Sequence, residues 1–380
     1  MDLLECRAKI DEIDKKLVDL FAERMEVAKG VAEYKMANNL PVLDRTRERE
    51  KIQSIIEYSP DNVKEYTPTL YQMIFELSRS YQHKLLQTGS EITEKIKDAI
   101  ENTPKLFPER SAIACQGIAG ANSQIAVEIF FINVYIIYFI TFEAVFQAIE
   151  KGLCKYGVIP VENSVAGSVN KVYDLMLKHN FYIAKSIRLK IDHNLLAVPG
   201  TKIENIKEIY SHEQAISQCS NFLSTLKDVK VIPCENTAIA AKRVAESGRS
   251  DVAALASESC VQYYGLQNLA ASVQNVDNNY TRFICISKDL EIYPGANKTS
   301  IMMVLPHEPG ALYKVLSRFF ALDVNLIKLE SRPLPSHEFE FMFYFDLEKQ
   351  VYAPELLQLL ADLPGSCVRF EYLGSYSEVI

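Results

Sequence analysis

The chain lacks the features that would place it in a special class. Its 380 residues contain no apolar run of the roughly 18 residues that a membrane-spanning helix needs. The eight cysteines are scattered, with no CxxC pair and no signal-peptide pattern before them, so we expect reduced thiols in a cytoplasmic protein. The six histidines show no metal-ligand spacing, so we expect no metal. An excess of positive charge is also missing: the net charge of −8 argues against nucleic acid but allows small anions bound by local cations.

What is present is the composition of an ordinary globular protein of two or three domains. Hydrophobic residues make up 48% of the chain, which is enough for packed cores. The glycine-containing loops carry neither GxGxxG nor GxxxxGK[ST], the two phosphate-binding fingerprints. We therefore expect no cofactor.

The N-terminal region predicts one long helix. Residues 3–38 contain no Pro and only one Gly, and Pro41 ends the pattern. Apolar residues recur along it with heptad spacing, so the helix needs partner helices. Two are predicted, over 44–58 with Asp44 as N-cap and over 67–86. The heptad seam consists of Leu3, Cys6, Ile10, Ile13, Leu17, Leu20, Val27, Val31 and Tyr34.

Arg24 occupies a seam position where an apolar residue is expected. A guanidinium there is costly unless an anion meets it, so Arg24 either fixes the helix register or belongs to an anion site. Lys35 lies about 16 Å further along nearly the same face. Arg7 lies about 26 Å from Arg24, too far for one small ligand to contact both on one helix. Arg7 would therefore serve the site of a second chain, which predicts a dimer.

Residues 1–88 resemble the all-helical chorismate mutase domain. The motifs that carry the resemblance are LLECRAKIDEIDKKL, AER at 22–24, PVLDRTRERE and ELSRSYQ. The resemblance implies an isomerase that converts chorismate to prephenate by a Claisen rearrangement, which needs a pre-oriented substrate and no nucleophile. It implies that Lys35 and Gln82 act at the ether oxygen. The implied substrate-binding residues are Arg7 (from the partner chain), Arg24, Lys35, Asp44, Arg47, Glu48, Ser78 and Gln82.

The middle region predicts an α/β domain over 110–290, after a polar linker over 89–109. Its strands are expected to be mostly parallel, with ligands bound beyond their carboxyl ends. Thr281 and Arg282 lie where a polar loop enters a buried strand, a usual place for binding residues. The apolar run 130–140 has no functional explanation, and we predict that it promotes aggregation if exposed.

Residues 111–288 resemble prephenate dehydratase. The motifs, in order, are QGIAGANS, PVENSVAGSVN, DHNLLAVPG, YSHEQAISQCSNFL, ENTAIAA, DVAALASESC, YGL and NNYTRF. The resemblance implies a carbon–oxygen lyase that forms phenylpyruvate, with two subdomains around a cleft, as in periplasmic binding proteins. Thr281 and Glu162 are implied as catalytic, although the sequence leaves open which residue delivers the proton. The implied substrate-binding residues are Asn163, Ser164, Ser211, Gln218, Glu235 and Arg282, the last as a carboxylate anchor, while His212 is expected to pack or cap.

The C-terminal region, 297–377, predicts a ferredoxin-like α+β domain. The strands are expected over 300–305, 324–329, 338–346 and 368–373, and the helices over 310–321 and 354–363. The motifs PGALYKVL and LESRP resemble an ACT regulatory domain that senses phenylalanine; a purely structural dimerisation module is the alternative. The implied effector-binding residues are Gly310, Ala311, Leu312, Asn325, Glu330, Ser331, Arg332 and Pro333.

Together these features predict a multidomain, bifunctional enzyme of L-phenylalanine biosynthesis. It would convert chorismate to prephenate and prephenate to phenylpyruvate, would be inhibited by L-phenylalanine, and would be a homodimer or higher homo-oligomer. Two alternatives stay open. The dehydratase could prefer arogenate, or the chain could be a non-catalytic cytoplasmic amino-acid sensor, because two-lobed α/β clefts also form solute-binding proteins.

Overall fold

The computed structural model describes residues 2–38, 40, 44–86, 90–334 and 341–379. The chain divides into two compact units, one formed by residues 1–98 with 301–371 and the other by residues 99–300 with 372–380. Within the described residues, no helix is long and apolar enough to cross a membrane. The end of the first predicted helix at Pro41 and the predicted start of the linker at residue 89 lie outside the described residues.

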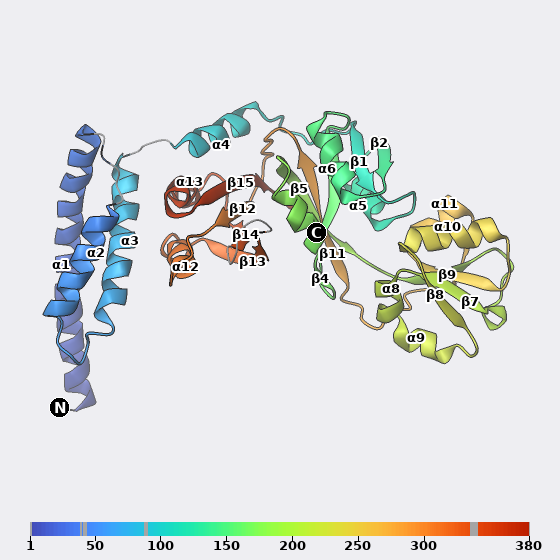
Figure 1. Cartoon of the computed structure of the whole chain (residues 1–380), viewed down its shortest axis with the longest axis horizontal. Coiled ribbons are helices and arrows are strands. Elements are labelled where there is room, and N and C mark those ends of the chain that lie inside the picture. The colour runs from blue at the N-terminus through green and yellow to red at the C-terminus, as the bar shows by residue number, and fades with distance from the viewer. Residues whose placement is uncertain (1, 39, 41–43, 87–89, 335–340, 380) are drawn as a thin grey trace. The chain divides into compact units, whose positions relative to one another are not determined.

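The first unit begins with three helices, α1 (Leu3–Ala37), α2 (Arg45–Tyr58) and α3 (Thr67–Leu86), which confirm the three predicted helices (Figure 1). Asp2 caps α1 and forms a capping box with Glu5. Asp44 caps α2 as predicted, because its carboxylate accepts a hydrogen bond from the Arg47 N–H at 3.0 Å.

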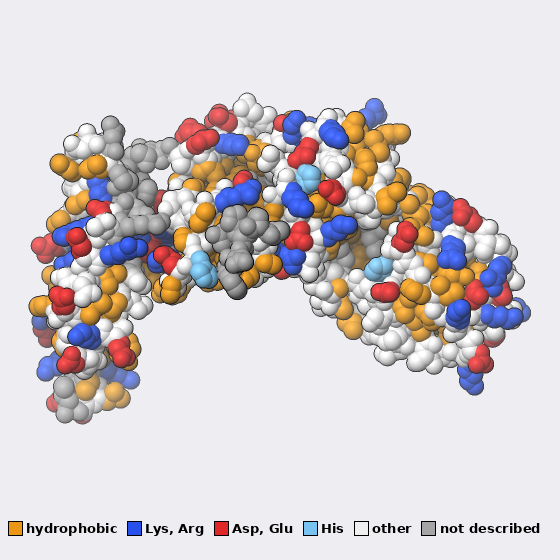
Figure 2. Space-filling view, in the orientation of Figure 1, with side chains coloured by type: hydrophobic (Ala, Val, Ile, Leu, Met, Phe, Trp, Pro, Cys, Tyr) orange, Lys and Arg blue, Asp and Glu red, His pale blue; other side chains and the backbone are white. Residues whose placement is uncertain are grey.

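The heptad seam of α1 is not the core of this bundle. The buried α1 residues are Met25, Ala28 and Ala32, whereas the seam residues Leu17 and Val27 are 56% and 66% exposed. The other helices pack on a different face of α1, because the buried positions 25, 28 and 32 each come one residue after the seam positions 24, 27 and 31. In a single chain most of the seam is therefore left exposed among charged side chains (Figure 2).

The C-terminal part confirms the predicted order of strands and helices, β12 (Lys298–Val304), α12 (Ala311–Ala321), β13 (Asn325–Pro333), β14 (Phe341–Glu348), α13 (Pro354–Asp362) and β15 (Arg369–Tyr376). These strands form one sheet in the order β13-β14-β12-β15. The first three residues of the strand predicted over 338–346 lie outside the described residues. The arrangement is the α+β topology that the sequence predicts.

The second unit contains two sheets, as expected for two subdomains (Figure 1). The first sheet has the order β16-β5-β11-β3-β1-β2, with β4 paired to β3. Its strands are β1 (Ala112–Gln116), β2 (Tyr135–Phe139), β3 (Tyr156–Asn163), β4 (Gly167–Ser168), β5 (Tyr182–Lys190), β11 (Tyr280–Ser287) and β16 (Glu378–Val379). The helices α4 (Glu91–Asn102), α5 (Asn122–Phe130), α6 (Phe142–Glu150) and α7 (Asn170–Met176) lie between these strands or before them in the chain.

The second sheet has the order β10-β6-β9-β7-β8. Its strands are β6 (Asn194–Ala197), β7 (Glu208–Ser211), β8 (Lys230–Pro233), β9 (Val252–Ala256) and β10 (Gln267–Ala270), with helices α8 (Glu213–Gln218), α9 (Ser220–Thr225), α10 (Thr237–Ser247) and α11 (Ser259–Tyr264). The expectation of mostly parallel strands was wrong, because β11 returns antiparallel between β3 and β5, and β6 pairs antiparallel with β9 and β10. The chain enters the second subdomain between β5 and β6 and returns to the first between β10 and β11.

The apolar run 130–140 divides between a helix end and an edge strand. Phe131 is buried, and residues 135–139 form the strand β2. Because β2 is the last strand of its sheet, Ile132, Tyr135 and Ile140 stay 75%, 73% and 89% exposed. Figure 2 shows hydrophobic side chains gathered around this strand. The predicted aggregation risk therefore concerns a surface that is exposed in the folded chain.

The C-terminal tail forms a strand that the sequence did not predict. β16 pairs in parallel with β5, with Glu378 opposite Ser186. The chain reaches this position by passing very close to β5: Gly374 has a φ of +130°, and a Cβ there would lie 2.5 Å from the Ile183 carbonyl oxygen. Only glycine fits this approach. The tail is thus part of the second unit.

Candidate active sites

A basic pocket lies among the three N-terminal helices. The described residues that line it are Arg24, Lys35, Asp44, Arg47, Glu48, Lys51, Phe75, Ser78, Arg79 and Gln82. Five of these side chains are basic and two are acidic, so the pocket favours an anion. It contains every residue predicted for the mutase site except Arg7, which lies near the start of the exposed α1 helix.

Arg24 is the strongest sign of an anion site. Its guanidinium lies over the Phe75 ring, 5.7 Å from the ring centre, and burial lowers the pKa of Arg24. The Nη1 atom is buried and has no hydrogen-bond partner among the described residues. A buried cationic donor of this kind is costly to leave unpaired, so the pocket is suited to a ligand carboxylate.

Ser78 and Gln82 form the neutral side of the same pocket. Gln82 Nε2 lies 3.3 Å from Ser78 Oγ, and both side chains are buried. The Gln82 carbonyl oxygen is buried and has no partner among the described residues. Rotation of the amide by half a turn would let Ser78 donate to that oxygen and would direct the NH2 group into the pocket. The pair can therefore donate to a ligand oxygen, as predicted for Gln82.

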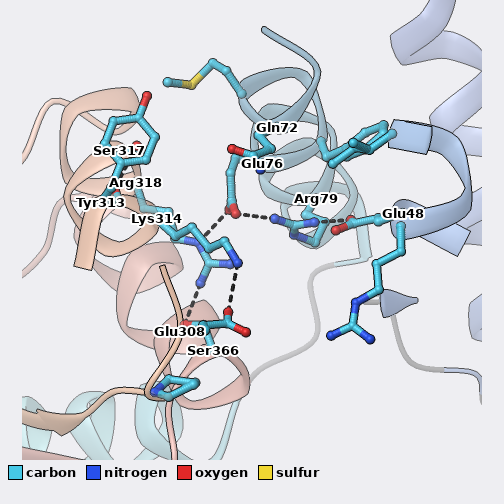
Figure 3. Close-up of a pocket in the computed structure, with 15 residues that line it drawn as sticks. Glu48, Gln72, Glu76, Arg79, Glu308, Tyr313, Lys314, Ser317, Arg318 and Ser366 are labelled. Atoms are coloured by element: carbon cyan, nitrogen blue, oxygen red, sulfur yellow. Dashed lines mark hydrogen bonds and ion pairs between the residues drawn. The ribbon is translucent and has the colours of Figure 1, made fainter. Parts of the chain in front are cut away.

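Glu48 is held by a chain of ion pairs that the sequence reading missed (Figure 3). Arg79 on α3 binds both Glu48 and Glu76, and Glu76 accepts a hydrogen bond of 2.7 Å from Arg318 Nε on α12. Burial raises the pKa of Glu76, but Arg318 and Arg79 outweigh that effect and lower it. Asp362 lies near these ion pairs, and its burial raises the pKa of its carboxyl group to about 7. The position of Glu48 thus depends on a helix that follows it by more than 260 residues.

In the second unit, strand pairing sorts the predicted catalytic residues onto two faces. Thr281 lies opposite Asn163, and Arg282 lies opposite Glu162, in the antiparallel pair of β11 and β3. Because successive side chains of a strand point to opposite faces, Thr281 and Asn163 share one face, and Arg282 and Glu162 share the other. The structure therefore groups Thr281 with Asn163 and not with Glu162.

Thr281 belongs to a network of amides. Asn163 Nδ2 donates to Thr281 Oγ1 at 2.9 Å and to Asn279 Oδ1 at 2.7 Å. Asn279 Nδ2 donates to Gln218 Oε1 at 3.1 Å, and His193 Nε2 lies 2.9 Å from the same oxygen. Since Thr281 Oγ1 accepts from Asn163, its own proton can be donated to a ligand.

His193 and Asn279 were not among the predicted site residues, although both lie in quoted motifs, DHNLLAVPG and NNYTRF. Both are buried, and burial lowers the pKa of His193. His193 is thus neutral at neutral pH, and its Nε2–H donates to Gln218 because that oxygen already accepts from Asn279. Gln218 Nε2 is buried and has no partner among the described residues, so it can donate to a ligand.

Arg282 is enclosed on the face away from Thr281. Its side chain is 4% exposed, and its Nη1 lies 3.2 Å from Glu162 Oε1. Its Nη2 donates to the Tyr376 hydroxyl at 2.6 Å, and its Nε lies 3.6 Å from Glu378 Oε2. The predicted anchor is therefore tied to two residues of the C-terminal tail.

The other predicted dehydratase residues have separate positions. Ser164 bonds to the backbone of Asn278 and Tyr280, and buried Ser211 donates to the Leu255 carbonyl. Glu235 lines a shallow depression with His212 and Arg243, and the described residues lining it do not include Thr281. His212 caps α8 by accepting from the Gln214 N–H at 3.3 Å, which confirms its predicted capping role.

The predicted effector residues are brought together only in part. Gly310, Ala311 and Leu312 line a groove with Phe341 and Phe343 of β14. Gly310 caps α12 with a left-handed backbone, and the Ala311 N–H of this first turn donates to the Glu308 carbonyl at 3.2 Å. Asn325 donates to Glu348 at 3.1 Å, and neither it nor Glu330, Ser331, Arg332 and Pro333 is among the described residues that line the groove.

Comparisons with known proteins agree with this division of sites. Residues 6–83 match the family described as chorismate mutase type II, and residues 113–291 match the prephenate dehydratase family. The bifunctional chorismate mutase/prephenate dehydratase of Aquifex aeolicus is 32% identical over 382 residues, which cover 100% of this chain and 99% of the relative. The chain belongs to this bifunctional family. It is an enzyme with both activities, and the non-catalytic sensor alternative was wrong.

Two further similar proteins each match 70% of the chain. The arogenate dehydratase/prephenate dehydratase 2 of Arabidopsis thaliana is 37% identical over 279 residues, 70% of this chain and 73% of the relative. The crystal structure of a prephenate dehydratase from Arthrobacter aurescens in complex with L-Phe is 26% identical, with a TM-score of 0.65 over 70% of this chain and 90% of that one. The α/β fold of the second unit is thus that of prephenate dehydratases.

Proposed function

We propose that the helical pocket binds chorismate as a dianion and folds it for rearrangement. The observation that carries this assignment is the buried, unpartnered Nη1 of Arg24 in a pocket of mainly basic side chains. Arg24 and Arg47 hold the carboxylates, Lys35 and Gln82 donate to the ether oxygen as it gains charge, and Ser78 orients Gln82. Asp44 and Glu48 address the ring hydroxyl side.

The exposed seam of α1 is the surface on which a second chain completes this pocket. Its residues are mostly apolar and exposed, with Arg24 among them, and Arg7 lies near one end of it, about 26 Å from Arg24 along the same helix. Antiparallel pairing of two such helices would bring Arg7 of one chain toward Arg24 of the other. The mutase is therefore active as a homodimer, and dilution below the dissociation constant should reduce mutase activity.

The second site removes carbon dioxide and water from prephenate. The bond from the ring to the carboxyl group breaks and releases carbon dioxide, its electron pair enters the ring, and the ring hydroxyl leaves as water after taking one proton from solvent. Thr281 donates its hydrogen bond to the leaving hydroxyl, with Asn163 fixing its orientation and the Gln218 amide reaching toward the substrate. Neutral His193 is a support and not the proton donor. Arg282 acts through Glu162, because it lies on the other face of the sheet.

The C-terminal α+β domain senses L-phenylalanine and inhibits the dehydratase. The support is the groove at the N-terminus of α12, where the positive end of the helix suits a carboxylate and Phe341 and Phe343 suit an aromatic ring. The related Arthrobacter aurescens enzyme was solved in complex with L-Phe. The ACT resemblance also assigns Asn325 and Glu330–Pro333 of β13 to the effector site, although they are not among the described residues that line the groove in the single chain.

Arogenate is a second candidate substrate for the dehydratase, favoured by the name of the Arabidopsis thaliana relative. Both compounds carry the ring carboxyl and hydroxyl groups that the reaction removes. The two are distinguished by kcat/KM for each substrate on the same preparation. We expect a higher value for prephenate, and a higher value for arogenate would reverse the assignment.

The experiment that tests the whole proposal supplies the chain with chorismate alone and follows phenylpyruvate. Phenylpyruvate should accumulate after a lag in which prephenate rises, and L-phenylalanine should reduce its rate. An unchanged dehydratase rate at saturating L-phenylalanine would contradict the regulatory part. Chorismate consumption without phenylpyruvate would contradict the assignment of the second site.

A further inference from the structure

The C-terminal tail supplies two buried groups to the interior of the dehydratase sheet. Tyr376 ends β15, Glu378 begins β16, and their side chains are 0% and 3% exposed. Buried polar groups are rare unless they are paired, and both of these meet the same guanidinium. That guanidinium belongs to Arg282, the neighbour of Thr281.

Glu378 resolves an electrostatic conflict in the sheet. Arg282 on β11 lies directly opposite Arg188 on β5, and like charges in this position repel. Glu378 Oε1 lies 3.0 Å from Arg188 Nε and 2.9 Å from Lys298 Nζ, and its other oxygen faces Arg282. The Glu378 carboxylate thus pairs with three cations. Its loss would leave Arg282 next to the positive charges of Arg188 and Lys298 without this carboxylate between them.

Tyr376 fixes the other end of the same guanidinium. Its hydroxyl accepts from Arg282 Nη2 at 2.6 Å and lies 2.6 Å from Ser300 Oγ. The buried hydroxyl therefore joins Arg282 to Ser300 and restricts the position of the guanidinium.

The remaining side of Arg282 faces the turn that holds Thr281. Nη1 lies 3.2 Å from Glu162, the residue before Asn163, and Asn163 binds both Thr281 Oγ1 and the turn N–H groups of Val165 and Ala166. A shift of Glu162 would move Asn163 with it. A contiguous set of contacts therefore joins the tail to the catalytic hydroxyl through Arg282.

We propose that Glu378 and Tyr376 are positioning residues of the dehydratase site, which hold Arg282 and through it the Glu162–Asn163 turn in register with Thr281. They do not touch the substrate. The inference rests on the proposed roles of Asn163 and Thr281. It predicts an effect on the chemical step, because misplacement of a catalytic group by about 1 Å can reduce turnover by up to about 100-fold.

The test is a double-mutant cycle on the full chain with prephenate as substrate. Glu378→Gln keeps the shape of the side chain and removes its charge, and it should lower kcat about tenfold with KM within about threefold. Tyr376→Phe should lower kcat by a smaller factor, and Glu378→Asp should recover most of the loss. Added to Arg282→Gln, the Glu378→Gln change should have no further effect, because both act through one guanidinium.

Two controls separate this role from a general loss of structure. Glu371→Gln removes a carboxylate that pairs at the surface with Arg369, and it should leave kcat unchanged. Mutase activity, measured in the same samples, should stay at the wild-type level in every variant. If Glu378→Gln has wild-type kcat, or if its effect adds to that of Arg282→Gln, the positioning role is wrong.

A further variant distinguishes this inference from the proposed function. If Asn163→Ala has wild-type kcat, the proposed dehydratase site itself is wrong. If Asn163→Ala is impaired while Glu378→Gln is not, only the role of the tail is wrong. If Glu378→Gln reduces the amount of folded protein, Tyr376→Phe, which removes one oxygen, is measured instead. A lowered kcat for Tyr376→Phe supports the positioning role, and a wild-type kcat contradicts it.

Discussion

The helical pocket and the dehydratase network take their residues from the chain in different ways. In the pocket, each of three consecutive helices contributes side chains at helical spacing, and all lie within the first 82 residues. In the network, Asn163, His193, Gln218, Asn279 and Thr281 come from both subdomains, and the tail contacts Arg282 on the other face of the sheet. In the proposed sites, the pocket would act mainly by charge, whereas the network would act by neutral donors that are held by hydrogen bonds. Mutase activity should therefore fall when a positive charge of the pocket is removed. Dehydratase activity should fall when a hydrogen bond that orients a donor of the network is removed.

The largest effect in the pocket is expected for Arg24→Gln. The change removes the buried cation that meets a substrate carboxylate, so mutase kcat/KM should fall roughly 100-fold or more. The rate of chorismate consumption by the variant and the wild type measures this fall in kcat/KM. Lys29→Gln is the matched control, because it removes one positive charge from an exposed position on the same helix. Equal activity of the two variants would contradict an anion site at Arg24.

In the network, Gln218→Ala should lower dehydratase kcat about 10- to 100-fold. The change leaves Asn279 and His193 buried without their shared acceptor, and it removes the free amide donor. The rate of phenylpyruvate formation measures the dehydratase kcat, and mutase activity in the same sample is the internal reference. Gln214→Ala, at an exposed position of the same helix, should resemble the wild type. A wild-type rate for Gln218→Ala would show that the network is structural only.

Arg318→Gln should have a smaller effect on the pocket. It removes the cation that holds Glu76 and so loosens Arg79 and Glu48, and mutase kcat/KM should fall about three- to tenfold. Lys314→Gln on the same helix is the control, because Lys314 pairs with Glu308 instead. Dehydratase turnover should not change in either variant. If the two variants have the same mutase activity, the ion-pair chain does not support Glu48.

The smallest effect is a pH-dependent change in stability at Asp362. Burial raises the pKa of this carboxyl to about 7, above its ordinary value near 4, so the folded state favours the protonated form. Stability is therefore lost as the pH rises from about 4 to about 7 and is constant above that. Asp362→Asn should be more stable than the wild type at pH 8, and the advantage should shrink at pH 5. Thermal unfolding at both pH values measures this, and an equal advantage at both would contradict the raised pKa.

The sequence predicted the pocket better than the network for a physical reason. Helical periodicity places Arg24 and Lys35 on one face, and the pair Ser78 and Gln82 one turn apart, so local spacing is enough. The dehydratase residues come together only through the register of β11 with β3 and through the approach of the second subdomain. Motif resemblance identified Thr281, Asn163 and Gln218, but no spacing rule connects them with His193.

Other features depend on contacts that no local pattern encodes. The tail strand β16 has two residues and no strand pattern, and Gly374 is the one residue whose conformation marks its path. Arg79 lay within a quoted motif, yet its role follows only from Glu76 and Arg318, which are far apart in the chain. The α1 seam was recognised, but the helices that follow pack on a neighbouring face of α1, at Met25, Ala28 and Ala32, and leave the seam exposed.

The most direct test of two separate sites in one chain is a paired assay of the wild type and Thr281→Ala. Chorismate loss and phenylpyruvate formation are followed in the same preparation. The mutant should keep wild-type chorismate consumption, accumulate prephenate and lose phenylpyruvate formation by roughly 100-fold or more, because its hydroxyl contacts the leaving group. If Thr281→Ala forms phenylpyruvate at the wild-type rate, the hydroxyl is structural, and the central assignment of the dehydratase site is wrong.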